Sequence, residues 1–550
     1  MHRKVLSYEG PQRGDLEETK KLLSLVSKIE EQEIIERYKD EPELKEDQDI
    51  NILQYFLFTK RKNALNEVVL LVQEWQRTVK IEKNFEARDC QLYTIGSYAL
   101  GVLDIDSDID CVLVAPEEFS RDTDFFTNFV KLLQENESVS DILPLPDTYV
   151  PIVKFKYNSF SFDIQFANYE DCADFGIFQH FLSKDLDRGS LLAINSIRNL
   201  EAIKNLVCYP KFQNVLRMVK LWARKRGIYS NIYGYLGGIS WAILVAQTCI
   251  SFPNFEINRL FHMFFNLFDV WKWPEPVILT SIDIPEVEDI NLDLNVWNPN
   301  LNYDDAEHIM PIITPYYPQF NTSVKVIPAT LSIIKKEFHR ACGFLKSKEE
   351  SLDTKISQLY EPYDITDDFS LFLRLDMISS KEDIHRWSGI IQNKLRVLLL
   401  SLQNIKNLSF RLIPQVYRTD DTSETLVIGM KYKKPKDKPE LKESTDNGNV
   451  QDAPPVEESK HQTQNGVLAQ KTGNFKLDLS VPILGSGEKN LKEDSIPLSV
   501  EFDHKCTLSE TLDIKEEVKS FIECVQGHRS LLCGDTIKIK LVKDLDDLAA

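Results

Sequence analysis

Four aspartates at alternating positions most constrain what this 550-residue chain can fold into. Asp104, Asp106, Asp108 and Asp110 lie within GSYALGVLDIDSDIDCVLVAP, and the apolar run 111–115 follows them directly. In an extended strand this spacing turns all four carboxylates to one face, where like charges repel. A carboxylate beside a buried strand is also partly withdrawn from water, which is costly without a partner. The segment is therefore either a metal site or a solvated acidic loop.

Three interpretations of the aspartates compete. A calcium loop that starts at Asp106 would have Glu117 as its twelfth residue, but its sixth residue, normally Gly, is Cys111. A simple acidic turn does not explain why a buried strand follows immediately. A two-metal phosphoryl-transfer site explains both features. Such a site needs two carboxylates on one strand face, hence DxD, and a third from a neighbouring strand.

The third carboxylate is offered by residues 151–167, which are predicted to form a β-hairpin with its turn at Asn158-Ser159. In FSFDIQF the apolar residues take one face of the strand, and Ser161, Asp163 and Gln165 take the other. Asp163 is the only acid in this hairpin. We therefore expect Asp108, Asp110 and Asp163 to be the catalytic residues and the metal ligands. Asp104 and Asp106 are expected earlier, on the loop.

The Gly96-Ser97 pair precedes the aspartates. A Gly-Ser turn that follows a strand and enters a helix presents backbone N–H groups and a hydroxyl to a phosphate. The pair alone is a weak signal. It becomes a stronger one when DID follows ten residues later and a lone aspartate stands on a later strand.

Composition limits the possible functions. The net charge of −20 argues against general binding to nucleic acid, but residues 184–231 contain ten Lys or Arg against three acids, and residues 202–255 contain no acid. This basic band predicts a local phosphate site. No apolar run approaches the length of a membrane span, and the N-terminal sequence lacks the apolar core of a secretory signal, so an intracellular protein is expected. The nine cysteines form no CxxC, which favours reduced thiols over a structural zinc site.

The order of elements predicts an α+β multidomain protein. Helices are expected at 15–37 and 51–79, and the chain becomes helical after the hairpin. From about residue 365 the pattern is β-α-β-β, then a polar segment, then α-β, which is a ferredoxin-like layout. RNA-recognition motifs use this layout, although their RNP stretch is absent here. The polar, Pro-bearing segment 434–473 is expected to be a disordered linker.

The aspartate segment resembles the nucleotidyltransferase signature of eukaryotic nuclear poly(A) polymerases, which belong to the DNA polymerase beta-like superfamily. The resemblance continues in KLWARKRGIYSNIYGYLGGISWAILVAQTC, in WKWPEPVIL and in VWNPN…HIMPIITPYYPQFNTSVKV, and it covers residues 10–345. The first of these three further blocks separates this family from other nucleotidyltransferases, because CCA-adding, uridylyl and oligoadenylate enzymes share the G/S-DxD signature.

The resemblance implies a set of nucleotide contacts. Lys220 and Tyr229 would contact the triphosphate, Asn231 the sugar or phosphate, and Ile239 the adenine face. The full implied nucleotide-binding set is Ile95, Gly96, Ser97, Asp104, Lys220, Tyr229, Asn231, Gly237, Gly238 and Ile239. Two departures stand out: Ile95 replaces a common Phe, and Glu201 stands where the family's Ser-Leu-Asn-Gly has Asn. Base discrimination by the residue at position 201 is therefore left open.

The resemblance also implies an organisation into domains. N-terminal helices (1–54) would pack on a helical central domain (181–347), and a nucleotidyltransferase catalytic domain with a mixed sheet would occupy 55–180. An RRM-like RNA-binding domain would combine 348–433 with 474–550, interrupted by the linker 434–473.

The implied reaction is the template-independent transfer of AMP from ATP to an RNA 3′-hydroxyl, with two Mg²⁺ or Mn²⁺ ions and release of pyrophosphate. The expected partners are the RNA 3′ end and the cleavage and polyadenylation factors, without a membrane. The expected protein is nuclear and monomeric. The alternatives are a terminal uridylyltransferase or other RNA nucleotidyltransferase, and a catalytically inactive RNA-binding or scaffold subunit.

Overall fold

The computed structural model describes residues 5–38, 50–104, 107–148, 150–169, 186–282, 296–433, 514–526, 535–542 and 545. The predicted linker 434–473 and Asp106 lie outside these residues. Contacts within the chain divide it into two compact units, 1–363 and 364–550.

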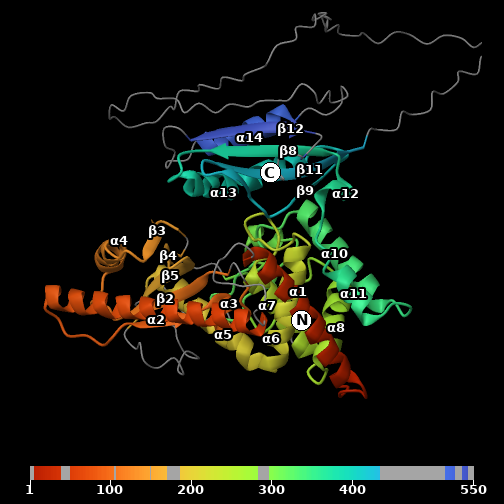
Figure 1. The fold of residues 1–550 in the computed structure, drawn as a ribbon, viewed down its shortest axis with the longest axis horizontal. Helices are drawn as coiled ribbons and strands as arrows, with labels where there is room; N and C mark the ends of the chain where they lie inside the picture. Colours follow the sequence, from red (N-terminus) through yellow and green to blue (C-terminus); the bar gives the residue numbers. More distant parts are fainter. Residues whose placement is uncertain are drawn as a thin grey trace, which may run out of the picture. The chain divides into compact units, whose positions relative to one another are not determined.

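A five-stranded mixed sheet in the first unit carries the aspartate segment (Figure 1). Its order is β1-β2-β5-β4-β3, and only β2 and β5 run parallel. The strands are β1 Gln91–Thr94, β2 Ile109–Ala115, β3 Val139–Leu145, β4 Ile152–Tyr157 and β5 Phe160–Asn168. The predicted hairpin is confirmed as β4 and β5. Its two turn residues, Asn158 and Ser159, have positive φ, as a tight two-residue turn requires.

Both faces of this sheet are covered. On one face, apolar residues of β2 and β5 pack against the long helix α2 (Ile50–Lys83) and the π-helix η1 (Arg121–Phe129), which continues into α4 (Val130–Gln134). On the other face, Val112, Val114 and Ala167 pack against α5 (Arg188–Leu206). The strands therefore alternate between two cores, and Asp110 falls on the α5 side, two residues before Val112.

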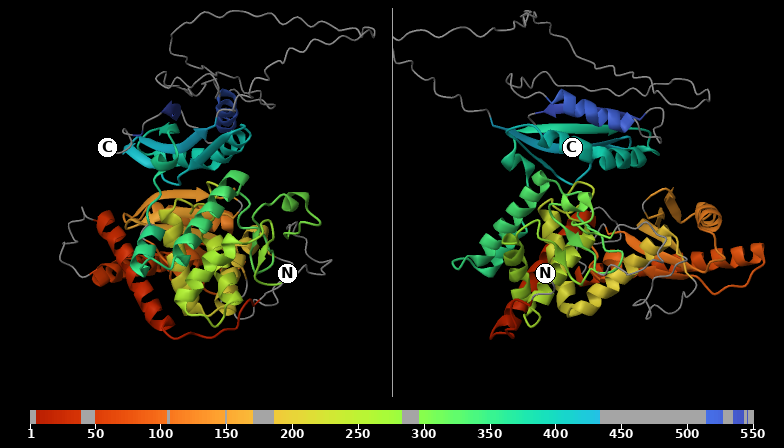
Figure 2. Two further views of the ribbon diagram at one scale, coloured as in Figure 1. Left: turned by 90° about the vertical axis from the view of Figure 1, so that its right-hand side faces the viewer. Right: turned by 180° about the vertical axis from the view of Figure 1, so that it is seen from behind.

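The remainder of the first unit is helical, and Figure 2 shows its helices from two further sides. Its helices are α1 Asp15–Tyr38, α3 Gly96–Ala99, α6 Tyr209–Lys225, α7 Gly238–Ser251, α8 Ile257–Asp269, α9 Tyr303–Ala306, α10 Pro328–Lys346 and α11 Leu352–Leu359. Two short parallel strands, β6 Val277–Ile278 and β7 Ile312–Ile313, lie among them. A cluster of aromatic rings joins α6, α7, α8 and α10, with Trp222, Trp241 and Phe338 at its centre.

The second unit is an antiparallel sheet with two long helices. Its elements are α12 Ile365–Asp368, β8 Leu371–Ile378, α13 Ile384–Gln403, β9 Leu408–Leu412, β10 Tyr417–Asp420, β11 Ser423–Tyr432, α14 Lys515–Gln526 and β12 Thr536–Val542. β8 lies between β11 and β12, and β9 pairs with β11 on its other side. This pairing matches the predicted ferredoxin-like layout.

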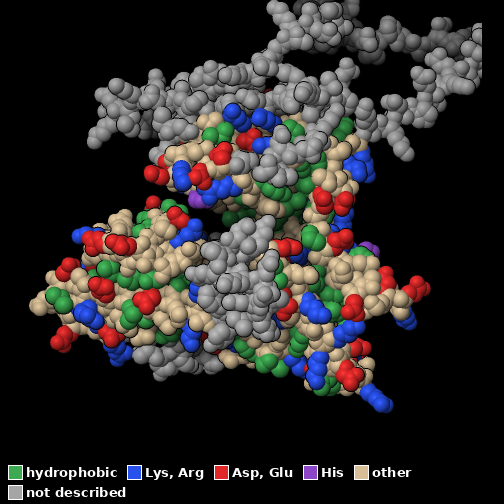
Figure 3. Space-filling view, viewed as in Figure 1, with side chains coloured by type: hydrophobic (Ala, Val, Ile, Leu, Met, Phe, Trp, Pro, Cys, Tyr) green, Lys and Arg blue, Asp and Glu red, His purple; other side chains and the backbone are tan. Residues whose placement is uncertain are grey.

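The fold class is thus confirmed as α+β. It combines a nucleotidyltransferase-type mixed sheet, a helical central region and a C-terminal antiparallel sheet with helices. On the face drawn in Figure 3, acidic and basic side chains are interspersed over the described surface. In the part of the chain that the structure describes, no helix is both long and apolar enough to cross a membrane.

Candidate active site

Asp110 and Asp163 lie side by side on the central strands of the first sheet. The parallel register pairs Asp110 of β2 directly with Asp163 of β5. Residues in register on neighbouring strands point to the same face, so the two carboxylates project together. Their neighbours Ile109 and Phe162 point the other way, into the core with α2. The structure thus brings together two of the three predicted catalytic carboxylates from separate segments.

The surroundings of Asp110 disfavour its charged form. Burial, together with the negative charges of Asp163 and Asp108, raises the pKa of Asp110 to about 7 against the opposing effect of Lys154 and Lys220. Asp108, the third predicted ligand, is exposed just before β2 begins and acts on Asp110 through its charge. Like charges held this close favour a bound cation.

Lys154 supplies one positive charge at this position. It lies opposite Asp163 on β4, and its ammonium group forms an ion pair with the Asp163 carboxylate. Among the described residues, no group of three or more His, Cys, Asp or Glu side chains is arranged to hold a metal ion as it stands. The residue types nevertheless fit Mg²⁺ or Mn²⁺, which prefer carboxylate oxygens, and a divalent cation would relieve the repulsion on Asp110.

Asp104 does not join the other aspartates. Its carboxylate forms an ion pair with Arg224 and lies 3.5 Å from the Lys220 ammonium group, both on α6. Its backbone oxygen accepts a hydrogen bond from Arg61 of α2 at 3.0 Å. The repulsion expected from the alternating spacing is therefore relieved at Asp104 but persists between Asp108 and Asp110. Asp110 lies beside Asp163, and Asp104 lies toward basic residues.

The Gly96-Ser97 turn approaches the Asp110 carboxylate closely. Gly96 has a φ of +62°, and a Cβ atom there would collide with the Asp110 carboxylate. The Ile95 N–H donates to the backbone oxygen of Asp110 at 2.8 Å, while the Ile95 side chain is only 6% exposed in the core. Only glycine both adopts this positive φ readily and leaves room for the Asp110 carboxylate at position 96. Ser97 accepts a hydrogen bond from the Val102 N–H through its backbone oxygen at 3.0 Å.

Lys220 is the predicted triphosphate contact that lies deepest. It is 4% exposed and donates to the backbone oxygen of Val102 at 2.9 Å. Burial lowers the pKa of Lys220 to about 8, although the charge of Asp110 opposes that shift. Its ammonium group lies 5.8 Å from the centre of the Tyr229 ring. The structure therefore places Lys220 among Asp110, Asp104 and Tyr229.

Two further basic residues of α6, Arg217 and Arg224, have acidic partners on α1. Arg217 lies 3.3 Å from Glu30, and Arg224 lies 3.7 Å from Glu33. Lys225 also pairs with Glu33, at 2.7 Å. The sequence predicted a local phosphate site in this basic band. The structure shows that acidic residues of α1 pair with three of its cations, Arg217, Arg224 and Lys225.

The predicted residues from Tyr229 to Ile239 lie in the loop after α6 and in the first turn of α7. Tyr229 and Leu236 form an isolated parallel β-bridge. A Cβ atom on Gly238 would lie 3.0 Å from the Tyr229 hydroxyl. Burial raises the pKa of Tyr229 to about 12, so its phenol stays protonated and can donate a hydrogen bond. A Cβ on Gly237 would lie 3.3 Å from the Cβ of Asn231. Asn231, Gly238 and Ile239 are exposed, the last of them by 37%, so this side of the loop is open.

From the sequence we predicted no role for Lys154 or Arg61, and the effect of Glu201 was left open. Lys154 could have been found, because a turn at 158–159 places it opposite Asp163 in the predicted hairpin. Arg61 could not, because nothing local in α2 points to the Asp104 loop. Glu201, on α5, forms a 3.0 Å ion pair with Lys204 and is 54% exposed.

A mixed sheet that pairs two carboxylates on adjacent strands, with a glycine turn against them and a buried lysine nearby, defines a nucleotidyltransferase. The comparisons with known proteins agree. Residues 56–207 match the family model of the poly(A) polymerase nucleotidyltransferase domain, and residues 211–362 match that of the poly(A) polymerase central domain. The chain belongs to the poly(A) polymerase family.

Individual relatives give the extent of this similarity. Nuclear poly(A) polymerase 1 of Arabidopsis thaliana is 34% identical over 385 residues, which cover 67% of this chain and 52% of the relative. Poly(A) polymerase PAPalpha of Candida albicans is 36% identical over 355 residues, 62% of each chain. The match therefore spans about half to three-fifths of the length of these two relatives.

Solved structures are more distant. One of Cid1, described as providing a basis for RNA terminal uridylyl transferase activity, has a TM-score of 0.39 and 18% identity, over 55% of this chain and 94% of that chain.

Proposed function

We propose that the chain is a polynucleotide adenylyltransferase that adds AMP from ATP to RNA 3′-hydroxyl ends without a template. The observation that carries this proposal is the register of Asp110 beside Asp163, with the buried Lys220 close enough to act on Asp110. Membership of the poly(A) polymerase family supports adenylyl transfer over other nucleotidyl transfer.

Asp108, Asp110 and Asp163 would hold two divalent cations, Mg²⁺ or Mn²⁺, which when bound activate the attacking hydroxyl and stabilise the leaving pyrophosphate. Lys154 neutralises Asp163 while no cation is bound. The Gly96 turn gives the triphosphate close access to the backbone beside Asp110. Lys220 contributes a buried positive charge, and Tyr229 contributes a protonated hydroxyl.

The remaining contacts belong to the same proposal. Asn231 would bind the sugar or phosphate, Gly237 and Gly238 would admit the nucleotide close to the backbone, and Ile239 would pack on the adenine. The three-domain division, an RNA-binding role for residues 348–433 with 474–550, a nuclear location, a monomeric state and partnership with cleavage and polyadenylation factors are also proposed. The names of relatives such as nuclear poly(A) polymerase 1 support the nuclear location.

A primer-extension assay tests the function. The purified chain is given an oligo(A) RNA primer, Mg²⁺ or Mn²⁺, and each of the four nucleoside triphosphates in turn. We expect extension with ATP, and we expect its loss in Asp110→Ala. Preference for UTP would instead indicate a uridylyltransferase. A folded wild-type protein that extends with no nucleotide would favour the scaffold alternative.

A further inference from the structure

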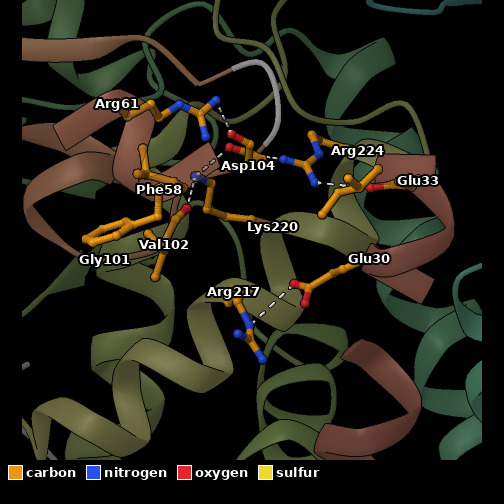
Figure 4. A pocket seen from close by; sticks show the side chains of 12 residues that line it. Glu30, Glu33, Phe58, Arg61, Gly101, Val102, Asp104, Arg217, Lys220 and Arg224 are labelled. Atoms are coloured by element: carbon orange, nitrogen blue, oxygen red, sulfur yellow. Dashed lines mark hydrogen bonds and ion pairs between the residues drawn. The ribbon is translucent and has the colours of Figure 1, made fainter. Parts of the chain in front are cut away.

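Asp104 pairs with Lys220, the basic residue that the proposed function assigns to the triphosphate, and with its neighbour Arg224. Figure 4 shows the side chains of Arg61, Lys220 and Arg224 converging on this one residue. They line a cavity of about 220 Å³ between α1, α2, α6 and the loop that leads to the catalytic aspartates. An acidic side chain of the protein is therefore bound where positive charge gathers.

The Asp104 carboxylate is held in this position from within its own loop. The Asp104 N–H donates to the Ser107 hydroxyl at 3.0 Å, and the Ser107 hydroxyl in turn donates to the Asp104 carboxylate. The Asp104 side chain is 15% exposed, so solvent still reaches it. The carboxylate is thus fixed toward α6 but remains open to exchange with a ligand.

The two cations of α6 do not depend on Asp104 equally. Arg224 has a second carboxylate in Glu33, at 3.7 Å, and would keep that partner if Asp104 moved. Lys220 makes its short bond to the Val102 backbone oxygen, at 2.9 Å, and lies 3.5 Å from Asp104. An ammonium group has three donors, so Lys220 can turn toward a phosphate while it keeps its bond to Val102. Lys220 is therefore the cation that displacement of Asp104 would release.

We propose that Asp104 acts as a built-in substitute for substrate phosphate, holding Lys220 and Arg224 until the triphosphate of ATP displaces it from Lys220. This inference rests on the proposed function. It makes Asp104 a positioning residue that acts through Lys220. Asp104 would then compete with the nucleotide for Lys220, whereas the resemblance implied a direct contact between Asp104 and the nucleotide. A buried cation kept paired in this way avoids an uncompensated charge in the empty site.

The test measures ATP binding without turnover. The full chain is titrated calorimetrically with ATP and, separately, with adenosine, in the presence of Mg²⁺ and without RNA. Because Asp104→Asn removes the competing charge, we expect it to lower the Kd of ATP roughly three- to tenfold. The Kd of adenosine, which has no phosphate, should not change. Asp104→Glu keeps the charge and should restore the wild-type Kd of ATP.

Two further variants complete the test. Asp89→Asn neutralises another ion-paired aspartate of the same unit, outside the cavity, and should leave the Kd of ATP unchanged. Asp104→Ser keeps a hydroxyl for Arg224 and should reproduce the tightening if Asp104→Asn does not fold, as judged by thermal unfolding. A Kd of ATP that is unchanged or higher in folded Asp104→Asn would overturn the inference and leave the proposed function intact. Failure of wild-type protein to bind ATP would overturn both.

Discussion

At the scale of single residues, the site depends on charges held in unfavourable surroundings. Lys220 is buried and Asp110 is partly buried, and the loss of water shifts the pKa of each so that its neutral form is favoured. Each acts on the other electrostatically, yet neither is fully compensated. Such perturbed pairs in one place are typical of functional sites, because the missing charge is supplied by substrate or metal.

Binding of ATP should weaken as pH rises through about 8. The pKa of Lys220 is lowered to about 8, so the ammonium form that attracts phosphate prevails below this pH and is lost above it. The Kd of ATP, measured by calorimetry from pH 6.5 to 9.5, should therefore rise above pH 8. Lys220→Arg keeps its charge over this range and should remove the rise. A wild-type Kd that stays constant to pH 9.5 would contradict this role.

The metal-free protein should lose stability as pH rises toward 7 because of Asp110. Its folded pKa of about 7 lies above the unfolded value of about 3.9, so between these values the folded state binds more protons than the unfolded state. The contribution of Asp110 to the stability of the folded state is thus most favourable at low pH and is lost as pH rises through the folded pKa. In EDTA, Asp110→Asn should have a higher Tm than wild type at pH 8 and a smaller difference at pH 5. The reverse order of Tm values would show that neighbouring groups stabilise the charged form of Asp110.

At the scale of elements, the β4–β5 hairpin holds an ion pair that can be tested by two neighbouring lysines. Lys154 pairs with Asp163, whose side chain is 13% exposed, and Lys156 pairs with Asp141, which is 54% exposed. Lys154→Met leaves a partly buried carboxylate unpaired and should cost about 1–3 kcal/mol of unfolding free energy in EDTA. Lys156→Met should cost at most about 1 kcal/mol. Mn²⁺ should stabilise the Lys154→Met protein more than wild type, and equal effects of Mn²⁺ on both would argue against a cation at Asp163.

The hairpin also shows how far the sequence alone could define the site. Alternation of apolar residues and the Asn158-Ser159 turn predicted β4 and β5, and with them the face on which Asp163 lies. Alternation could not show that β5 pairs in parallel with β2, because that register depends on packing against α2 and α5. Likewise, Arg217 and Arg224 belong to the basic band from which the sequence predicted a phosphate site. Their partners Glu30 and Glu33 come from a helix far away in the sequence, which no local pattern encodes.

At the scale of the whole molecule, all described residues of the candidate site belong to the unit 1–363. Each unit has its own buried apolar residues, including Leu244 in the first and Leu375 in the second, both with no exposed surface. A core of its own is what allows a unit to fold separately. We therefore expect the stability of the two units to respond separately to mutation and to ATP.

Matched core substitutions and calorimetry can test this separation. Leu244→Ala and Leu375→Ala each remove the same buried side chain and should cost about 2–5 kcal/mol, but in different unfolding transitions. ATP with Mg²⁺ at 100 times its Kd should stabilise only the transition that Leu244→Ala lowers, by about 2.7 kcal/mol. Leu375→Ala should leave the Kd of ATP unchanged, because no described site residue lies in the second unit. A single transition that both substitutions lower, and that ATP raises as a whole, would mean that the units unfold cooperatively and that the second unit contributes to the stability of the nucleotide site.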